Sequence, residues 1–405
     1  MRRFIMRILC LTENYPPNKG GMSQSCDRIV HSLRNHRGKD IQVDVLHFSK
    51  EKSFRRSHTS MVAHDAVLQK GGSYIRCSRH NDAAHTLQLG LRALERFTEG
   101  LKHDFLLVFG GQLPLVAAPT YSRLLGIPYI LCLRGNDFDH ALFDHKRKAS
   151  LDDAINNARA VCTVSTEKVE RLKKLYPKQH IYFTPNGIDL SRWEAMPSER
   201  SFAQKWRAEK LKPGQKVIGI FGHLKNKKAI FFFLEALMCS TLQDKPYIFA
   251  AGSLDEGLQA LLIENNLQHT VLPFQDRSEL IKYYLACDWV AIPSFYDGMP
   301  NVMLEAGSLG IPVIGSNVDG MRDIIQHQYS GLLFSCLKKQ ECSLAIRECA
   351  RMDFKKQLEL GANLQSRIVR EFTAEDEVKH YIKILETEHD KFINEELHSH
   401  RDSLT

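Results

Sequence analysis

The chain has 405 residues, of which 43% are hydrophobic and 25% are charged. This composition excludes disordered and fibrous proteins, and the length exceeds what one hydrophobic core usually covers, so we expect about two domains. The 55 Lys and Arg residues outnumber 47 Asp and Glu residues and leave a formal charge of +8, which favours an anionic partner such as a nucleotide, a phospholipid surface or an acidic glycan. Because the basic residues form short separate clusters instead of one stripe with interleaved aromatic residues, nucleic acid is not the expected partner.

The cysteines and the amino terminus bear on the cellular compartment. Ten cysteines occur without any Cys-x-x-Cys pair, several of them inside apolar runs, so we expect reduced core residues of a cytoplasmic protein and no metal site. The basic segment 1–6 leads directly into a strand-like run, without the apolar region of a signal peptide. No stretch approaches the ~20 apolar residues that span a bilayer. Any membrane contact is therefore expected to be peripheral, at the inner face.

Short apolar runs separated by segments of helix length make up the first half of the chain. Buried strands that alternate with helices predict a parallel, doubly wound sheet of the Rossmann type. We assign residues 1–195 to this first domain, with strands expected at Ile8–Thr12, Val43–Phe48, Phe105–Gly110, Tyr129–Leu133, Ala160–Val164 and Ile181–Thr184.

A polar segment over 190–216, which contains Pro197 and Pro213, interrupts the pattern and is predicted to be the interdomain linker. The alternation then resumes and predicts a second Rossmann-like domain over 196–372. Residues 373–405 show amphipathic helical spacing and are expected to pack back on the first domain. The expected strands of the second domain are Val217–Phe221, Tyr247–Ala251, Val271–Phe274, Trp289–Pro293, Pro312–Gly315 and Gly331–Phe334, and the default site is the cleft between two facing lobes.

The segment after the strand at Trp289 carries the clearest chemistry. Pro300 is placed to open a helix and Gly310 to close it, so the helix amino terminus should lie at the carboxyl edge of the sheet and favour a phosphate. Gly298 would let the backbone approach that ligand. Asn301 and Glu305 share one helix face, and Asp297 stands eight residues before Glu305. Two acidic groups in this arrangement can bind hydroxyls at opposite ends of a nucleotide sugar.

Two further segments favour an anionic ligand. Residues 217–228 predict a strand followed by a turn with clustered positive charge that ends at Lys228, although solvated surface charge would look similar. In the first domain, Gly20 and Gly21 join the first strand to a helix, where paired glycines permit close approach to a phosphate or sugar or serve packing alone.

These motifs resemble those of the family four retaining glycosyltransferases with the GT-B fold, the glycosyl transferases of group 1. The run 297–306 resembles the acidic-x7-acidic motif of that family, in which the second acid, here Glu305, binds the ribose and the first acid binds the transferred sugar. The usual first acid is Glu, and Asp297 departs from it. The resemblance also implies donor contacts from Gly298, Met299, Pro300 and Asn301.

The same resemblance covers nearly the whole chain. Residues 217–229 are similar to the Gly-Arg-Leu-x-x-x-Lys-Gly diphosphate clamp, with Gly222 and Lys228 in place, His223 where arginine is usual and Ala229 where glycine is usual. The Pro-x-x-Gly-Gly loop that ends at Gly21 and the run 185–189 match family motifs of the first lobe. Phe274 falls in the loop that lies along the nucleotide base.

One segment of the first domain departs from the family pattern. Arg134 stands where many relatives have His, and it could bind the departing phosphate or the acceptor. Asn136 and Asp137 are candidates on the acceptor side. Asp137-x-Asp139 also invites a metal-binding interpretation, but acid-x-acid pairs are expected by chance in this composition, and the resemblance implies no metal and no other cofactor.

We therefore predict an α/β protein of the GT-B type that moves a sugar from a nucleotide-diphosphate-sugar donor to a glycan, lipid-linked or small-molecule acceptor, with Asp297, Lys228 and Arg134 as the catalytic candidates. The alternatives are a nucleotide-sugar epimerase or hydrolase of the same fold, and a non-catalytic sensor that binds the nucleotide sugar.

Overall fold

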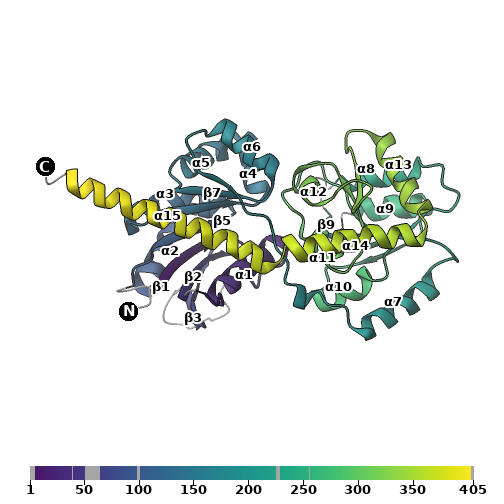
Figure 1. The fold of residues 1–405 in the computed structure, drawn as a ribbon, viewed down its shortest axis with the longest axis horizontal. Helices are drawn as coiled ribbons and strands as arrows, with labels where there is room; N and C mark the ends of the chain where they lie inside the picture. The colour runs from purple at the N-terminus through teal and green to yellow at the C-terminus, as the bar shows by residue number, and fades with distance from the viewer. Residues whose placement is uncertain are drawn as a thin grey trace. The chain divides into compact units, whose positions relative to one another are not determined.

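The computed structural model describes residues 5–38, 40–50, 64–97, 101–224, 229–254 and 256–402. The chain forms two compact units, one built from Met1–Pro185 together with Ala374–Thr405 and the other from Asn186–Thr373. Each unit is built on its own sheet, and the ribbon in Figure 1 shows which elements belong to each.

The first unit has an eight-stranded sheet in its described part, in the order β3-β4-β2-β1-β5-β6-β7-β8. The six predicted strands are all present and pair in parallel. β3 and β4 were not predicted; they form an antiparallel hairpin, and β4 continues the sheet beside β2. The strands are β1 (Ile5–Thr12), β2 (Asp40–Ser49), β3 (His64–Gln69), β4 (Gly72–Ser78), β5 (Phe105–Phe109), β6 (Tyr129–Leu133), β7 (Ala160–Thr163) and β8 (Ile181–Phe183).

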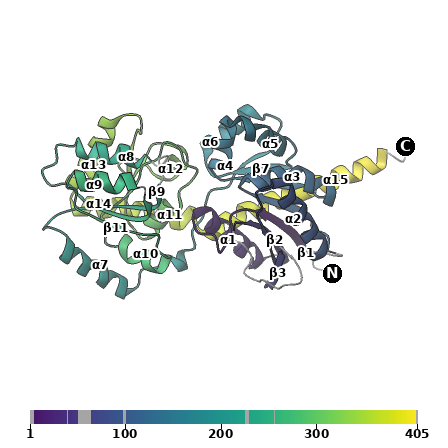
Figure 2. The same ribbon diagram turned by 180° about the vertical axis from the view of Figure 1, so that it is seen from behind.

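Helices cover both faces of this sheet because its strands alternate apolar residues toward each side. Leu9 and Leu11 of β1 pack with α2 to α6, whereas Ile8 and Cys10 pack with α1 and α15. Figure 2 shows the same ribbon from behind. The helices are α1 (Gly21–Arg34), α2 (Ala83–Phe97), α3 (Gln112–Leu125), α4 (Asn136–Phe143), α5 (His145–Asn156), α6 (Thr166–Leu175) and α15 (Ala374–Asp402).

The terminal helix α15 is bound to the first unit by apolar contacts and by the buried carboxylates of Glu377 and Glu388, of which Glu388 pairs with Arg159. Val378 and Tyr381 lie in the core beside α1. Glu377, 2% exposed, accepts hydrogen bonds from Arg28 at 2.7 Å and from Arg134 at 2.9 Å. Burial alone would raise the pKa of the Glu377 carboxyl, but Arg28 and Arg134 outweigh that effect and hold it below its usual value.

The second unit has a six-stranded parallel sheet in its described part, in the order β11-β10-β9-β12-β13-β14. All six strands expected here are present: β9 (Val217–Leu224), β10 (Tyr247–Leu254), β11 (His269–Leu272), β12 (Trp289–Ile292), β13 (Val313–Ser316) and β14 (Gly331–Phe334). α8, α9 and α13 pack against one face through a core that includes Ile218 and Ile248. The helices are α7 (Pro197–Lys210), α8 (Ile230–Met238), α9 (Glu256–Glu264), α10 (Arg277–Tyr284), α11 (Asn301–Ser308), α12 (Asp319–Ile324), α13 (Lys339–Arg351) and α14 (Phe354–Glu371).

The segment 190–216 is not the irregular linker expected from its polarity. It contains a 3-10 turn (Leu190–Arg192) and the helix α7, in which Pro197 is the first helical residue. Trp206 of α7 packs edge-on against Phe249 of β10, with the ring centroids 5.8 Å apart. A helix with so few apolar positions looks like a linker in sequence, but its aromatic residues bind it to the sheet.

Candidate functional site

The loop after β12 carries Asp297 and leads into α11, as predicted. Pro300 is the residue before the first turn of α11, and Gly310, with φ of 73°, lies just beyond its end. Asp297 is half-buried, and its Oδ1 accepts a hydrogen bond of 3.0 Å from the backbone N–H of Gly298. The helix amino terminus thus lies at the carboxyl edge of the parallel sheet, where backbone N–H groups favour an anion.

Neighbouring segments hold this loop from two sides. The side-chain amide of Asn186 donates to the carbonyl oxygen of Met299 at 2.6 Å. On the other side, the backbone N–H of Asp297 donates to Asp319 Oδ2 at 3.1 Å, and the N–H of Gly320 donates to the carbonyl oxygen of Gly298 at 2.8 Å. The contact is so close that a Cβ added at Gly320 would lie 2.2 Å from that oxygen. The loop conformation is therefore fixed by groups outside it.

Asp319 and Gly320 were missed by the sequence analysis. Asp319 is 3% exposed and has a φ of 42°, a left-handed conformation that a non-glycine residue rarely adopts. A charged residue followed by glycine, three residues after the end of the buried strand β13, was the available signal.

Glu305 lies on α11 and is 9% exposed. Its Oε2 accepts a hydrogen bond of 2.7 Å from the hydroxyl of Tyr284, whose ring stacks on Phe221 with the centroids 3.9 Å apart. Burial and the adjacent Glu305 carboxylate raise the pKa of Tyr284 well above its usual value, so this hydroxyl remains a donor. A buried carboxylate orientated by a fixed donor is suited to accept hydrogen bonds from ligand hydroxyls.

The end of β9 lies beside this helix. Gly222 has a φ of 102°, and a Cβ added to it would have Val302 of α11 as its nearest neighbour, at 3.8 Å. The fold therefore brings Gly222 and the Asp297–Glu305 segment to the same part of the second unit. Phe274 follows the outer strand β11. Lys228 lies outside the described residues, as does the side chain of His223.

In the first unit, Gly20 precedes the first turn of α1 with φ of 119°, and Gly21 begins the helix. The preceding loop is bound to two other elements. Glu13 accepts hydrogen bonds from the backbone N–H groups of Gln112 at 2.9 Å and Leu113 at 3.3 Å, at the amino terminus of α3. Asn18 is 3.1 Å from Nε2 of the buried His47. Glu13 was not among the predicted site residues.

Arg134, for which a contact with a phosphate or acceptor is predicted, has its described contacts within the first unit. Its side chain is 2% exposed and donates to Glu377 at 2.9 Å and to the hydroxyl of Tyr381 at 2.8 Å. The guanidinium also lies 5.2 Å from the ring centroid of Phe109. These contacts pair the charge within the unit, and the contact of Arg134 with a ligand stays a prediction.

The carboxylates of Asp137 and Asp139 both have partners within the first unit. Asp137 Oδ1 accepts hydrogen bonds from the backbone N–H groups of Gly135 at 2.7 Å and Phe138 at 3.1 Å, next to the start of α4. Asp139 forms an ion pair of 3.0 Å with the fully buried Lys168. Among the described residues, no three His, Cys, Asp or Glu side chains are grouped as metal ligands. Asn136 begins α4, and its side chain lies outside the described part.

Two family models match this chain. The model "Glycosyltransferase Family 4" matches residues 19–192, and the model "Glycosyl transferases group 1" matches residues 202–367. The match over 19–192 lies mainly in the first unit, and the match over 202–367 lies entirely within the second unit. The chain belongs to the group 1 glycosyltransferases.

Relatives agree with this assignment, and a solved structure shares the fold. TuaC of Bacillus subtilis, whose name assigns it to teichuronic acid biosynthesis, is 30% identical over 217 residues, which are 53% of each chain. The Escherichia coli UDP-Gal:alpha-D-GlcNAc-diphosphoundecaprenol alpha-1,3-galactosyltransferase is 26% identical over 52% of this chain and 57% of that protein. The chain thus matches about half the length of these relatives. Anabaena Alr3699/HepE, solved with UDP-glucose, superposes with a TM-score of 0.73 at 18% identity and covers 94% of this chain and 100% of that one, which supports the GT-B fold.

Two further findings concern membranes and cysteines. No helix in the described ranges is both long and apolar enough to cross a bilayer. All ten cysteines are free, and nine of them are buried, as expected for core residues.

Proposed function

We propose that this protein transfers a glycosyl residue from a nucleoside-diphosphate-sugar donor to a glycan, lipid-linked or small-molecule acceptor, with retention of the anomeric configuration. The observation that carries the proposal is the fixed Asp297–Glu305 segment, in which a buried carboxylate and a helix amino terminus lie at the carboxyl edge of the second sheet. The names of the relatives support this activity, since each denotes a glycosyltransferase or glycan synthesis.

In the proposed reaction, the bond between the anomeric carbon and the diphosphate breaks and a bond to an acceptor oxygen forms. The nucleoside diphosphate leaves with the electron pair of the broken bond, and the proton of the acceptor hydroxyl passes to it. Glu305 would bind the ribose, Asp297 would orient the sugar, and Gly298, Met299, Pro300 and Asn301 would approach the phosphates and sugar. Preorganised N–H groups at the start of α11 stabilise charge that develops on the leaving group.

The remaining donor contacts complete this assignment. Gly222, His223 and Lys228 would lie along the diphosphate, Phe274 along the base, and Gly20 and Gly21 would contact the donor from the first unit. Since Lys228 and the backbone N–H groups at the start of α11 would stabilise the negative charge of the diphosphate, we propose that no metal ion is required. We also propose a cytoplasmic protein that contacts the membrane peripherally, because a relative is named for a diphosphoundecaprenol acceptor.

The test is a panel of UDP-, GDP- and ADP-sugars incubated with the full chain, with and without candidate acceptors. Mass spectrometry should show a glycosylated acceptor, and proton NMR of the fresh product should show the donor's anomeric configuration. Activity should survive EDTA, and Lys228→Ala should lose roughly 10²-fold or more in turnover. Complete loss in EDTA that Mn²⁺ or Mg²⁺ restores would contradict the metal-free mechanism, and free sugar as the only product would identify a hydrolase.

A further inference from the structure

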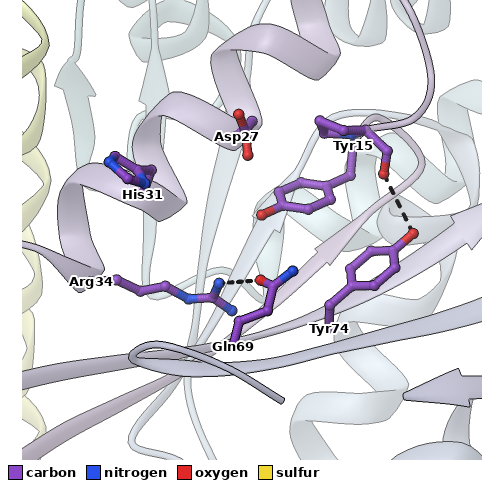
Figure 3. A pocket seen from close by; sticks show the side chains of 7 residues that line it. Tyr15, Asp27, His31, Arg34, Gln69 and Tyr74 are labelled. Carbon is purple, nitrogen blue, oxygen red and sulfur yellow. Dashed lines mark hydrogen bonds between the residues drawn. The ribbon is translucent and has the colours of Figure 1, made fainter. Parts of the chain in front are cut away.

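A cavity of about 320 Å³ lies in the first unit, on the side of α1 that faces β3 and β4. Its lining residues, six of which are labelled in Figure 3, are Tyr15, Pro16, Asp27, His31, Arg34, Gln69 and Tyr74. Asp27, His31 and Arg34 are spaced for one face of α1. The volume falls at the lower end of the range for small-molecule sites.

Three polar groups in this cavity remain available for a ligand. The Asp27 carboxylate and the Tyr15 hydroxyl have no hydrogen-bond partner in the described part of the chain, although Tyr15 is only 6% exposed. Gln69 Oε1 accepts from Arg34 at 2.5 Å, which leaves its amide nitrogen, turned toward Tyr15 in Figure 3, as a donor. An acceptor, a donor and a hydroxyl that can do both match the hydrogen-bonding pattern of neighbouring sugar hydroxyls.

The charge in this cavity disfavours an anionic ligand. The Arg34 guanidinium is already used: its Nη2 donates to the carbonyl oxygens of Val43 at 2.5 Å and Ser73 at 3.1 Å, in addition to the bond with Gln69. The Asp27 carboxylate has no such partner among the described residues. A phosphate or carboxylate in this cavity would therefore be repelled by the Asp27 carboxylate, and the Arg34 guanidinium, already hydrogen-bonded within the protein, would not offset that repulsion.

The apolar part of the cavity comes from Tyr15, Tyr74 and Pro16. The two tyrosine rings stack with the centroids 5.5 Å apart and the planes at 25°. The Tyr74 hydroxyl is fixed by His47 Nδ1 at 2.9 Å. Rigid aromatic surface with a few placed polar groups is typical of ligand sites.

We propose that this cavity binds a neutral sugar unit of the acceptor glycan, with Asp27, Tyr15 and Gln69 contacting its hydroxyls. The inference rests on the proposed function, which supplies the glycan acceptor. Tyr15 and Pro16 belong to the same β1–α1 loop as Gly20, to which donor contacts are assigned above. A sugar bound in the cavity would thus contact the same loop to which donor contacts are assigned.

The test separates glycan binding from donor binding. The full chain and its variants are applied to an array of neutral and uronic-acid-containing oligosaccharides, and the affinity for neutral glycans that bind is measured by calorimetry. Tyr15→Phe and Asp27→Asn should each weaken neutral-glycan binding at least about tenfold, because each removes a hydrogen-bonding group or a charge without changing shape. Glu95→Gln, at an exposed position of α2 outside the cavity, is the matched control and should bind as the parent does.

Donor binding is measured on the same proteins with the UDP-, GDP- and ADP-sugar panel. Donor binding that persists while the array shows no neutral glycan, or while both cavity variants bind glycan as the parent does, overturns the inference and leaves the proposed function standing. Glycan binding that both variants lose, in a protein that binds no donor, supports the cavity and contradicts the proposed function. A preference for uronic-acid glycans that Asp27→Asn strengthens would also overturn the inference.

Discussion

The amide nitrogen of Asn186 lies 2.6 Å from the carbonyl oxygen of Met299, although 113 residues separate them in the chain. This bond fixes the middle of the loop that carries Asp297. We predict that Asn186→Ala lowers donor affinity at least about tenfold and costs about 1–3 kcal/mol of unfolding free energy, because a buried carbonyl loses its donor. Calorimetry and denaturant unfolding measure the two effects. Asn265→Ala removes an exposed amide bond to a helix carbonyl and should change neither quantity appreciably.

Gly320 permits the close contact with the carbonyl oxygen of Gly298. Gly320→Ala would place a methyl group 2.2 Å from that oxygen, so the loop must move and turnover should fall by an order of magnitude or more. Gly214→Ala is the control, because Gly214 has a φ of 76° and no neighbour within 4 Å of an added Cβ. It should cost stability of about 1 kcal/mol but leave the kinetics unchanged. Equal turnover in both variants would show that the loop tolerates displacement.

Glu305→Ala should abolish donor binding while the protein stays folded. The reason is that the carboxylate is expected to accept hydrogen bonds from the ribose. Tyr284→Phe, which removes the hydroxyl 2.7 Å from Glu305 but retains the ring on Phe221, should weaken binding less. Calorimetry with the cognate donor checks both variants. If Glu305→Ala binds within about threefold of the parent, a loss below ~1 kcal/mol, Glu305 is structural.

The free energy of unfolding of the first unit should depend on pH through His47. Burial lowers the pKa of His47 to about 4, and the nearby Arg76 adds to that effect, whereas an unfolded chain keeps a pKa near ~6.5. The unfolded state therefore binds a proton first as the pH falls. The folded state, in which His47 is buried in its neutral form, therefore has its full free energy of unfolding above pH ~6.5. This free energy falls progressively toward pH ~4, by up to about 3 kcal/mol. Urea unfolding at pH 7 and pH 4.5 measures this loss, and His47→Gln should show a smaller difference between the two pH values.

Arg134 and Glu377 should behave as a structural pair. Arg134→Leu leaves Glu377 with Arg28 as its remaining ion-pair partner among the described residues, so we predict a loss of about 3–5 kcal/mol in unfolding free energy, within the range for broken buried pairs. A double-mutant cycle with Glu377→Gln should give a coupling energy above ~1 kcal/mol. Loss of turnover in Arg134→Leu without loss of stability would instead restore the predicted role at the reacting sugar.

The sequence predicted the repeating architecture because parallel strands buried on both faces are continuous apolar runs, as at β5 and β6. It also placed Pro300 and Gly310 correctly at the ends of α11, since both residues act through the local backbone. It could not show that Asp319 and Gly320 hold the Asp297 loop, because that contact depends on the packing of two adjacent strand ends. The burial of Arg134 was hidden for a similar reason: its partner lies 243 residues away.

The return of α15 to the first unit has a consequence for the order of synthesis. A ribosome releases 186–373, the whole of the second unit, before the residues of α15 that carry Glu377 and Glu388. Domains commonly fold in order from the amino terminus. During that interval Arg28, Arg134 and Arg159 of the nascent first unit lack these carboxylate partners, while the six strands described for the second unit have already been translated. The part of the chain that is translated first is thus completed last, and until α15 is made, the apolar sheet face that it helps to cover lacks those contacts.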